Sequence, residues 1–597
     1  MINKRELHRL LALLFAFTLV AAACGGSDDG DDGGTEESSE ETSEESEETT
    51  RTTIENTEIA EVEDEIALGG RLVVGIDGEP GGLRPWEDTS TNAFMNLGGT
   101  VYDKLFEYDE NFEPQPYLVE SYTVSDDNMT YVLTLREGVT FHNGEPFNAQ
   151  TLVDMFEIQK AGTSSAGPAA AITSIEATGE YEATYNLARP SGVLPASLTR
   201  PQLGMVFEPA AAAADPEGFA DAPVGTGPFM VTERDIDNRT VLAKNPDYWR
   251  TDADGNQLPY LDEIEFRPMP EENQRLDALL ASDIDMFVTL RGATIRDSRN
   301  EADLVLYEFQ GNLTGGGIFN MSLAPTDDVR VRRGLSLLNP QDQVIEALGA
   351  TGLSEPATQF FSPDSPFYSQ AVADGYPSFD FEAGVASLQD YVDDPARSDG
   401  KAAGEPIDIV LACPADPTLT AAMQVMEGVW TQTGLLTVEL LQTESAAHVP
   451  MAMGAAPDFV GEHQAHCWRF SSDEDPSTPL FGLVAPPNTA SAEEAATIVP
   501  SATPSATNFT DWWSLEAYTA YIQASQIADV AARQALYESV FLAANEDVPL
   551  WYSGHTPLAF VTTDAVKGIN GWHLPDGSLG SGIQGVEGRF FEVFVTE

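Results

Sequence analysis

The spacing of apolar residues predicts strands and turns before about residue 270, and alternating helices and strands after it. Strands are expected at 71–76 and within 130–141, 172–187 and 228–244. The last of these ranges is typical of a hairpin that turns at Asp237-Asn238. Asn148 is expected to cap a helix, because apolar residues recur at helical spacing directly after it.

After residue 270 the period changes repeatedly between that of a helix and that of a strand. Helices are expected at 272–281, 328–338, 382–392, 419–434, 446–453 and 530–547, and strands at 284–290, 407–413, 436–442 and 458–464. Strands joined by helical crossovers predict a parallel sheet with right-handed connections, which is the α/β class.

The start of the chain has the pattern of an export signal. Lys4, Arg5 and Arg9 precede an apolar run, and small residues then lead to Cys24. The run is too short for a permanent membrane span. Residues 1–23 resemble a bacterial lipoprotein signal, which implies cleavage before Cys24 and a diacylglycerol on its sulfur; the alternative is an ordinary secretory signal cleaved near Ala23.

Residues 24–67 are mostly Gly, Ser, Thr, Asp and Glu, so we expect a disordered acidic tether between the lipid and a folded body. The body begins at about 68 and is longer than one hydrophobic core usually serves, which predicts at least two lobes. A net charge of −68 argues against a nucleic-acid partner, because phosphate contacts need clustered Lys and Arg.

Only three cysteines are present, so a lipid on Cys24 leaves Cys413 and Cys467 as a single possible pair in an oxidising exterior. The two lie at the ends of two expected strand segments, 407–413 and 458–467. In the usual 2-1-3 order of such a unit these two strands are neighbours. We therefore expect a disulfide between Cys413 and Cys467.

Several segments of the body, in the same order along the chain, resemble family 5 of the extracellular solute-binding proteins, which bind peptides, dipeptides and nickel for ABC importers. The longest is 116–156, and the others are 224–229, 244–250, 259–266, 319–335 and 546–552. The resemblance implies a two-lobe flytrap of the periplasmic-binding-protein type, a monomer that passes its ligand to the importer's permease subunits at the outer face of the cytoplasmic membrane.

In that fold the chain crosses the hinge twice. The resemblance implies a discontinuous lobe I at 68–270 and 551–597, with an extra β-rich subdomain, and a lobe II at 271–550. The ligand is expected in the cleft between them. A peptide is the first expectation, and sugars, nickel chelates and opines are alternatives on the same scaffold.

The segment 458–481 carries the main candidates for ligand contact, because ligands of open α/β sheets bind beyond the carboxyl ends of strands. Trp468 offers a flat apolar face, Arg469 a fork for a carboxylate, and Asp473 an anion for an amine. The resemblance places the amine-binding acid four positions before Pro476, where this chain has Ser472. The alternative is that these residues form a solvated loop.

Phe94 and Trp86 follow the first strand, in a region that lines the cleft in the family, although core packing is the common fate of such residues. His463, His466 and Cys467 resemble part of a metal site, but no fourth ligand is evident, so neither a metal nor a cofactor is expected. No motif of a hydrolase or nucleotide-binding enzyme stands out. The chain is expected to be a binding protein, with an exported hydrolase or a surface adhesin as alternatives.

Overall fold

The structure is a computed structural model that describes residues 57–60, 62, 64–88, 91–363, 365–453, 461–471, 476–485, 508–583 and 587–596. All of them belong to one unit, residues 51–597. The predicted signal at 1–23, Cys24 and Asp473 lie outside the described residues. No helix of the described part is long and apolar enough to cross a membrane.

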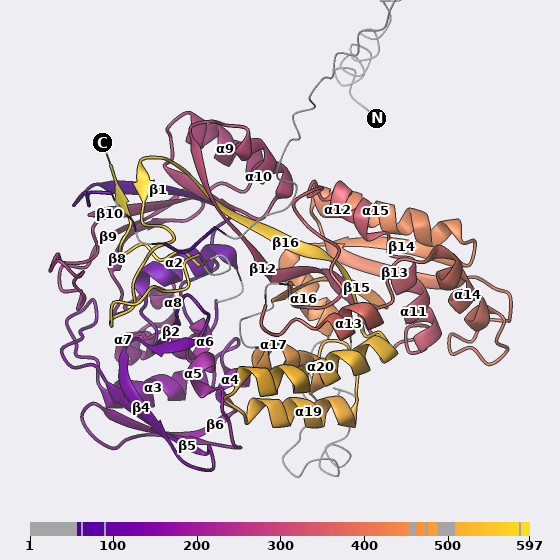
Figure 1. Ribbon diagram of the computed structural model, residues 1–597, viewed down its shortest axis with the longest axis horizontal. Coiled ribbons are helices and arrows are strands. Elements are labelled where there is room, and N and C mark those ends of the chain that lie inside the picture. Colours follow the sequence, from indigo (N-terminus) through magenta and orange to yellow (C-terminus); the bar gives the residue numbers. More distant parts are fainter. Residues whose placement is uncertain are drawn as a thin grey trace, which may run out of the picture. The chain divides into compact units, whose positions relative to one another are not determined.

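A ten-stranded sheet runs through this unit in the order β14-β13-β15-β12-β16-β11-β1-β10-β9-β8 (Figure 1). Its strands are β1 (Arg71–Ile76), β8 (Phe229–Asp235), β9 (Arg239–Lys244), β10 (Glu263–Pro268), β11 (Met286–Thr289), β12 (Leu304–Phe319), β13 (Ile407–Pro414), β14 (Leu436–Thr443), β15 (Ala465–Ser471) and β16 (Leu550–Thr563). The α/β class is confirmed, and the order β14-β13-β15 is the 2-1-3 order that the sequence predicts.

The expectation of a parallel sheet holds for only part of the sheet, which is mixed. Parallel pairs occur at β1 with β10 and β11, and at β13 with β14 and β15. Between these two groups, the long strand β12 runs antiparallel to both β15 and β16 (Figure 1). The sheet is mixed because the chain passes from one parallel group to the other along β12 and returns along β16.

Separate hydrophobic cores lie on either side of these two long strands. The first is built from residues between Leu72 and Val288 together with Leu558–Phe594. Two others are built from residues between Ile318 and Tyr552. A fourth core joins Leu279, Ile284, Phe287, Ile295 and Leu353 to Ala559 and Val561 of β16, and β11 pairs with β1 and β16. The lobe boundaries themselves stay a prediction.

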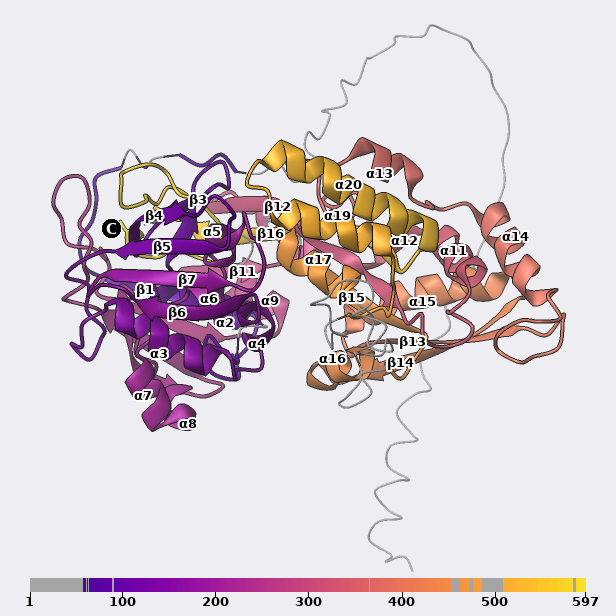
Figure 2. The ribbon, with the colours of Figure 1, turned by 90° about the horizontal axis from the view of Figure 1, so that it is seen from below.

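A four-stranded antiparallel sheet in the order β4-β5-β7-β6 accompanies the first core, with α3 (Ala149–Gln159) packed on β6 and β7 (Figure 2). Asn148 caps α3 as predicted, since its side chain accepts hydrogen bonds from the backbone of Gln150 and Thr151. The remaining elements of this part are β2 (Phe106–Tyr108), β3 (Pro114–Pro116), β4 (Val119–Val124), β5 (Thr130–Leu135), β6 (Ile172–Ala177), β7 (Glu182–Leu187), α2 (Asn92–Val101), α4 (Ala166–Ala169), α5 (Leu194–Ser197), α6 (Pro201–Gly204), α7 (Pro209–Ala214) and α8 (Pro216–Phe219).

Six helices of the second half lie close to their predicted ranges, at 272–280, 329–337, 381–392, 417–432, 445–453 and 530–547, and five others were not predicted. The second half has eleven described helices in all. They are α9 (Glu272–Leu280), α10 (Gly292–Arg299), α11 (Val329–Leu337), α12 (Gln341–Ala347), α13 (Gln370–Gly375), α14 (Phe381–Val392), α15 (Pro417–Gln432), α16 (Ser445–Met453), α17 (Ser477–Val484), α19 (Leu515–Ser525) and α20 (Val530–Asp547), and two short strands, β17 (Val566–Lys567) and β18 (Phe594–Val595), complete the fold. The predicted strand at 458–464 is wrong in position over its described part: residues 462–464 form bends and β15 starts at Ala465, where pairing with β12 begins. Residues 458–460 lie outside the described residues.

The folded body also begins earlier than expected. The Thr57 backbone N–H donates to the Glu308 carbonyl at 2.8 Å, and the Glu308 N–H donates to Thr57 Oγ1 at 2.8 Å. Asn570 Nδ2 donates to the carbonyl oxygen of Glu58 at 3.0 Å. Thr57 and Glu58 of the predicted tether are therefore bonded to β12 and to the C-terminal segment, partners that composition cannot reveal.

Candidate ligand-binding site

Four charged residues converge where strands of the large sheet end. Asp77 follows β1, Arg291 follows β11, Asp416 follows β13, and Arg469 lies near the end of β15. Asp77 and Asp416 raise the pKa of Arg469 and the cation of Arg291 lowers it, so the four side chains lie within electrostatic reach of one another. The carboxyl ends of parallel strands are the usual ligand-binding edge of an open α/β sheet.

Arg469 is the cation of this group whose charge is not paired within the described residues. Its side chain is exposed, and it has no hydrogen bond or ion pair with any residue that the structure describes. Desolvation is nevertheless the largest cause of the lowered pKa of its guanidinium. Arginine stays charged under such conditions, so a partly desolvated cation here favours an anionic partner.

Arg291 and Asp416 connect the two parallel groups of the sheet. Arg291 Nη2 donates to Asp416 Oδ2 at 2.5 Å, and about a third of each side chain stays exposed, 33% and 29%. Asp416 also caps α15, because its Oδ1 accepts the Leu419 N–H at 2.8 Å. On the opposite side, Asn92 Nδ2 donates to Asp77 Oδ2 at 2.9 Å and orients that carboxylate.

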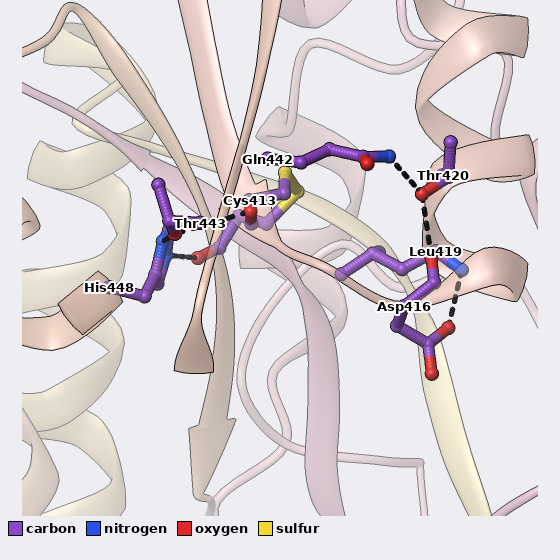
Figure 3. Close-up of a disulfide and its surroundings, with 8 residues drawn as sticks. Cys413, Asp416, Leu419, Thr420, Gln442, Thr443 and His448 are labelled. Carbon is purple, nitrogen blue, oxygen red and sulfur yellow. Dashed lines mark hydrogen bonds between the residues drawn. A yellow bond between two sulfur atoms is a disulfide. The ribbon is translucent and has the colours of Figure 1, made fainter. Parts of the chain in front are cut away.

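A disulfide holds β15 against β13 beside these charges (Figure 3). The structure joins Cys413 to Cys467 with a Cα–Cα distance of 4.9 Å. His448 reinforces the junction, since its Nε2 lies 2.9 Å from the Cys467 carbonyl oxygen and its Nδ1 lies 3.2 Å from Thr443 Oγ1 (Figure 3). Asp416 follows Cys413 by three residues and Arg469 follows Cys467 by two, so this link sets the spacing between the two charges.

Comparison with known proteins identifies the family to which this architecture belongs. The sequence profile of the bacterial extracellular solute-binding proteins, family 5, middle region, matches residues 113–487. This chain belongs to family 5 of the bacterial extracellular solute-binding proteins. The family expected from the sequence is thus confirmed.

Curated relatives of this family 5 protein share about a quarter of their residues with it. The dipeptide-binding protein of Escherichia coli is 26% identical over 51% of this chain and 60% of its own length. The di/tripeptide-binding protein 1 of Pseudomonas aeruginosa is 23% identical over 83% of this chain and 90% of its own length. The nickel-binding periplasmic protein of E. coli is 26% identical over 52% of this chain and 57% of its own length. The chain thus spans less than two thirds of some of the relatives it matches.

Solved structures confirm the periplasmic-binding-protein fold. The periplasmic binding protein DppA from Helicobacter pylori, in complex with the peptide STSA, matches 89% of this chain and 99% of its own with a TM-score of 0.71 and 21% identity. The oligopeptide-binding protein AppA from Bacillus subtilis, in complex with a nonapeptide, matches 89% and 100% with a TM-score of 0.71 and 19% identity.

In this family 5 chain, Trp468 and Arg469 do not share one face. Both lie within β15 rather than in a loop, and successive strand residues point to opposite faces. The half-buried Trp468 ring stacks on Phe509, with centroids 6.0 Å apart, and lies 6.3 Å from the ring of His448. The indole packs against the core that contains Phe470 and Tyr552, so less of it is available to a ligand than at a loop position.

Trp86 and Phe94 pack in the first core. Trp86 is 5% exposed and its ring lies 4.5 Å from that of Phe207, while Phe94 is fully buried. Neither presents a surface to a ligand in this structure. Asp473 lies outside the described residues, so its part in amine binding stays a prediction.

The histidines near β15 do not form a metal centre within the described residues, where no group of three or more His, Cys, Asp or Glu side chains converges suitably. Cys467 is bonded to Cys413, and burial lowers the pKa of His466 to about 3. Sequence reasoning missed Asp77, Arg291 and Asp416. Their one signal is that each is a charged residue within three positions of a strand end, which many surface residues share.

Proposed function

We propose that this family 5 protein captures a small ligand that carries a carboxylate, a peptide in the first place, and delivers it to an ABC importer. The observation that carries the proposal is Arg469, an exposed, partly desolvated guanidinium without a partner among the described residues, at the ligand-binding edge of the sheet. A carboxylate matches a guanidinium in charge and in bidentate geometry.

The choice of a peptide rests on the same geometry together with the relatives. Dipeptide- and di/tripeptide-binding proteins are among the curated matches, and two structural neighbours contain peptides. A peptide also carries an ammonium, for which Asp77 and Asp473 are candidate partners. Nickel- and heme-binding relatives show that the family accepts other ligands.

Binding is proposed to close the two lobes on one another. They are joined by β12 and β16, and Arg469 and Asp77 belong to strands on opposite sides of that pair. A ligand that contacts both sides favours the closed form by the contacts it gains there, and the importer recognises that form. The proposed location is the outer face of the cytoplasmic membrane, with Cys24 lipidated.

The test is native mass spectrometry of the protein as purified, followed by calorimetric titration with the ligand recovered or with the peptide STSA. Arg469→Ala is expected to cost about 2–5 kcal/mol of binding free energy if its partner charge is left buried. Arg239→Ala, at an exposed arginine on β9, is the matched control. Wild-type affinity in Arg469→Ala contradicts the site, and ligand recovered in cleaved form favours a hydrolase.

A further inference from the structure

Two guanidiniums from different parts of the sheet, those of Arg469 and Arg291, lie within electrostatic reach of one another beside the Arg291–Asp416 pair. Arg469 belongs to β15 and Arg291 follows β11, with β12 and β16 between those strands. Their mutual repulsion is one of the causes that lower the pKa of Arg469. Like charges near one another cost free energy, which here the carboxylates of Asp416 and Asp77 offset in part. A ligand carboxylate that contacts both guanidiniums offsets the repulsion more directly.

Arg291 keeps donors to spare. The guanidinium makes one hydrogen bond, from Nη2 to Asp416 Oδ2, and no other partner of its side chain occurs among the described residues. Asp416 in turn is divided between two tasks, since its Oδ1 holds the Leu419 N–H while its Oδ2 holds Arg291. Removing Arg291 from Asp416 leaves the helix cap in place, so the ion pair can open without unwinding α15.

The start of α15 adds to the positive field. It is a helix of 16 residues with Pro417 at its first position and Asp416 as its cap. The unpaired N–H groups and the dipole of a helix N-terminus favour negative charge. A ligand carboxylate at this corner therefore meets Arg291, Arg469 and the helix start, against the carboxylates of Asp416 and Asp77.

We propose that Arg291 and Asp416 form an exchangeable pair, in which a carboxylate of the ligand replaces Asp416 on Arg291 and is held at the same time by Arg469. Arg291 is thereby a second ligand-binding arginine. The inference rests on the proposed function and specifies how that site recognises its substrate. Because the two arginines lie on opposite sides of β12 and β16, a carboxylate shared between them also favours closure.

Asp416→Asn distinguishes exchange from a structural ion pair. Asn caps a helix about as well as Asp but does not compete for Arg291 as a charged group. If Asp416 competes with the ligand, Asp416→Asn binds STSA more tightly, by about fivefold or more. If the ion pair only supports the fold, the affinity stays equal or falls, and that result overturns the exchange.

Arg291→Gln supplies the complementary measurement. It is expected to weaken binding of STSA by about tenfold while leaving the affinity for the C-terminal amide of the same peptide at the wild-type value, because the amide has no carboxylate to lose. Arg291→Lys keeps the positive charge but lacks the planar fork of a guanidinium. Its affinity for STSA is expected to lie between those of the wild type and Arg291→Gln. An equal loss for acid and amide indicates a distorted site and contradicts the proposal.

A second arginine on a helix cap provides the matched control. Arg330 Nη2 lies 2.6 Å from Asp328 Oδ2, the side chains are 34% and 22% exposed, and Asp328 caps α11. Asp328→Asn and Arg330→Gln are expected to leave peptide affinity unchanged. If the wild-type protein binds neither STSA nor its amide, the peptide proposal fails and this one with it; wild-type binding without a gain in Asp416→Asn overturns the exchange alone.

Discussion

Cys413 and Cys467 face each other across the parallel strands β13 and β15, in register with the pairs Leu411–Ala465 and Ala412–His466. The bond closes a loop with a sequence separation of 54. It lies directly before Asp416 on one strand and Arg469 on the other, so the same link supports the fold and the candidate site.

Replacing both cysteines by Ala is expected to lower the free energy of unfolding by about 4 kcal/mol, mainly because the unfolded chain regains the entropy of the open loop. Urea unfolding of wild type and variant measures the difference, and reductant should remove it from the wild type. Thiol titration of the unfolded, unreduced mature protein is expected to find the pair blocked. Two free thiols per chain contradict the pairing.

Because several histidines are buried in the neutral form, the free energy of unfolding is expected to fall in mild acid. Burial lowers the pKa of His466 to about 3 and the pKa values of His142 and His555 to about 4, whereas unfolded histidine titrates at about 6.5. The unfolded chain therefore binds more protons between these values, and the stability present above pH 6.5 is lost as the pH falls toward 4.

Asp103 opposes this trend, because burial raises the pKa of its carboxyl to about 6 and the folded state then holds its proton more tightly. Three histidines outweigh one aspartate, so the net slope keeps its sign. Chemical unfolding from pH 7 to 5 measures it, and His466→Leu is expected to reduce the slope near pH 5 by about 1.4 kcal/mol per pH unit. An unchanged slope contradicts the burial of a neutral His466.

The contact of Gly192 with the loop after α19 is expected to favour closure of the lobes, although it lies away from the ligand. Its N–H donates to the Ser525 carbonyl at 2.9 Å, and a Cβ there would lie 2.7 Å from the Ile527 carbonyl carbon. Gly192→Ala is therefore expected to separate the loop after β7 from the loop between α19 and α20.

The variant should bind STSA about tenfold more weakly, a cost of about 1.4 kcal/mol, and show a larger radius of gyration by small-angle scattering with the peptide present. Gly428→Ala is the control, because a Cβ at that helical position meets nothing within 4 Å. Equal affinity in Gly192→Ala and wild type shows that this contact does not report closure.

Loss of the buried ion pair of Lys104, which lies far from the candidate site, is expected to lower the free energy of unfolding strongly. Its ammonium lies 2.7 Å from Glu587 Oε2 and both side chains are buried, at 2% and 6% exposure. Lys104→Met leaves the carboxylate of Glu587 without this partner and is expected to cost about 3–5 kcal/mol by urea unfolding. Lys160→Met removes an exposed pair with Glu157 and is expected to change stability by less than about 1 kcal/mol.

Cys24 predicts attachment to the membrane. Cys24→Ala is expected to release the protein from the membrane fraction into the medium or periplasm, because no lipid is then added. The measurement is fractionation with immunodetection beside the wild-type protein. Continued retention in the membrane contradicts a lipid anchor at this residue.

Elements with a strong local signal were predictable from the sequence. Helix α20 has the predicted range, 530–547, because Asp529 caps its start and Val548 ends it in a left-handed conformation. β15 was placed several residues too early, since its start is set by pairing with β12, a strand more than a hundred residues away. Its true position moved Trp468 and Arg469 from a loop into a strand, and so onto opposite faces.

The sequence by itself determined the family, the α/β class, several of the longer helices and the single possible cysteine pair, because periodicity, caps and motif order are local properties of the chain. Only the tertiary structure decided that Asp77, Arg291, Asp416 and Arg469 converge, and that Trp86 and Phe94 are core residues. The convergence depends on the order and direction of strands that lie far apart in sequence, and no local pattern carries the distance between their ends.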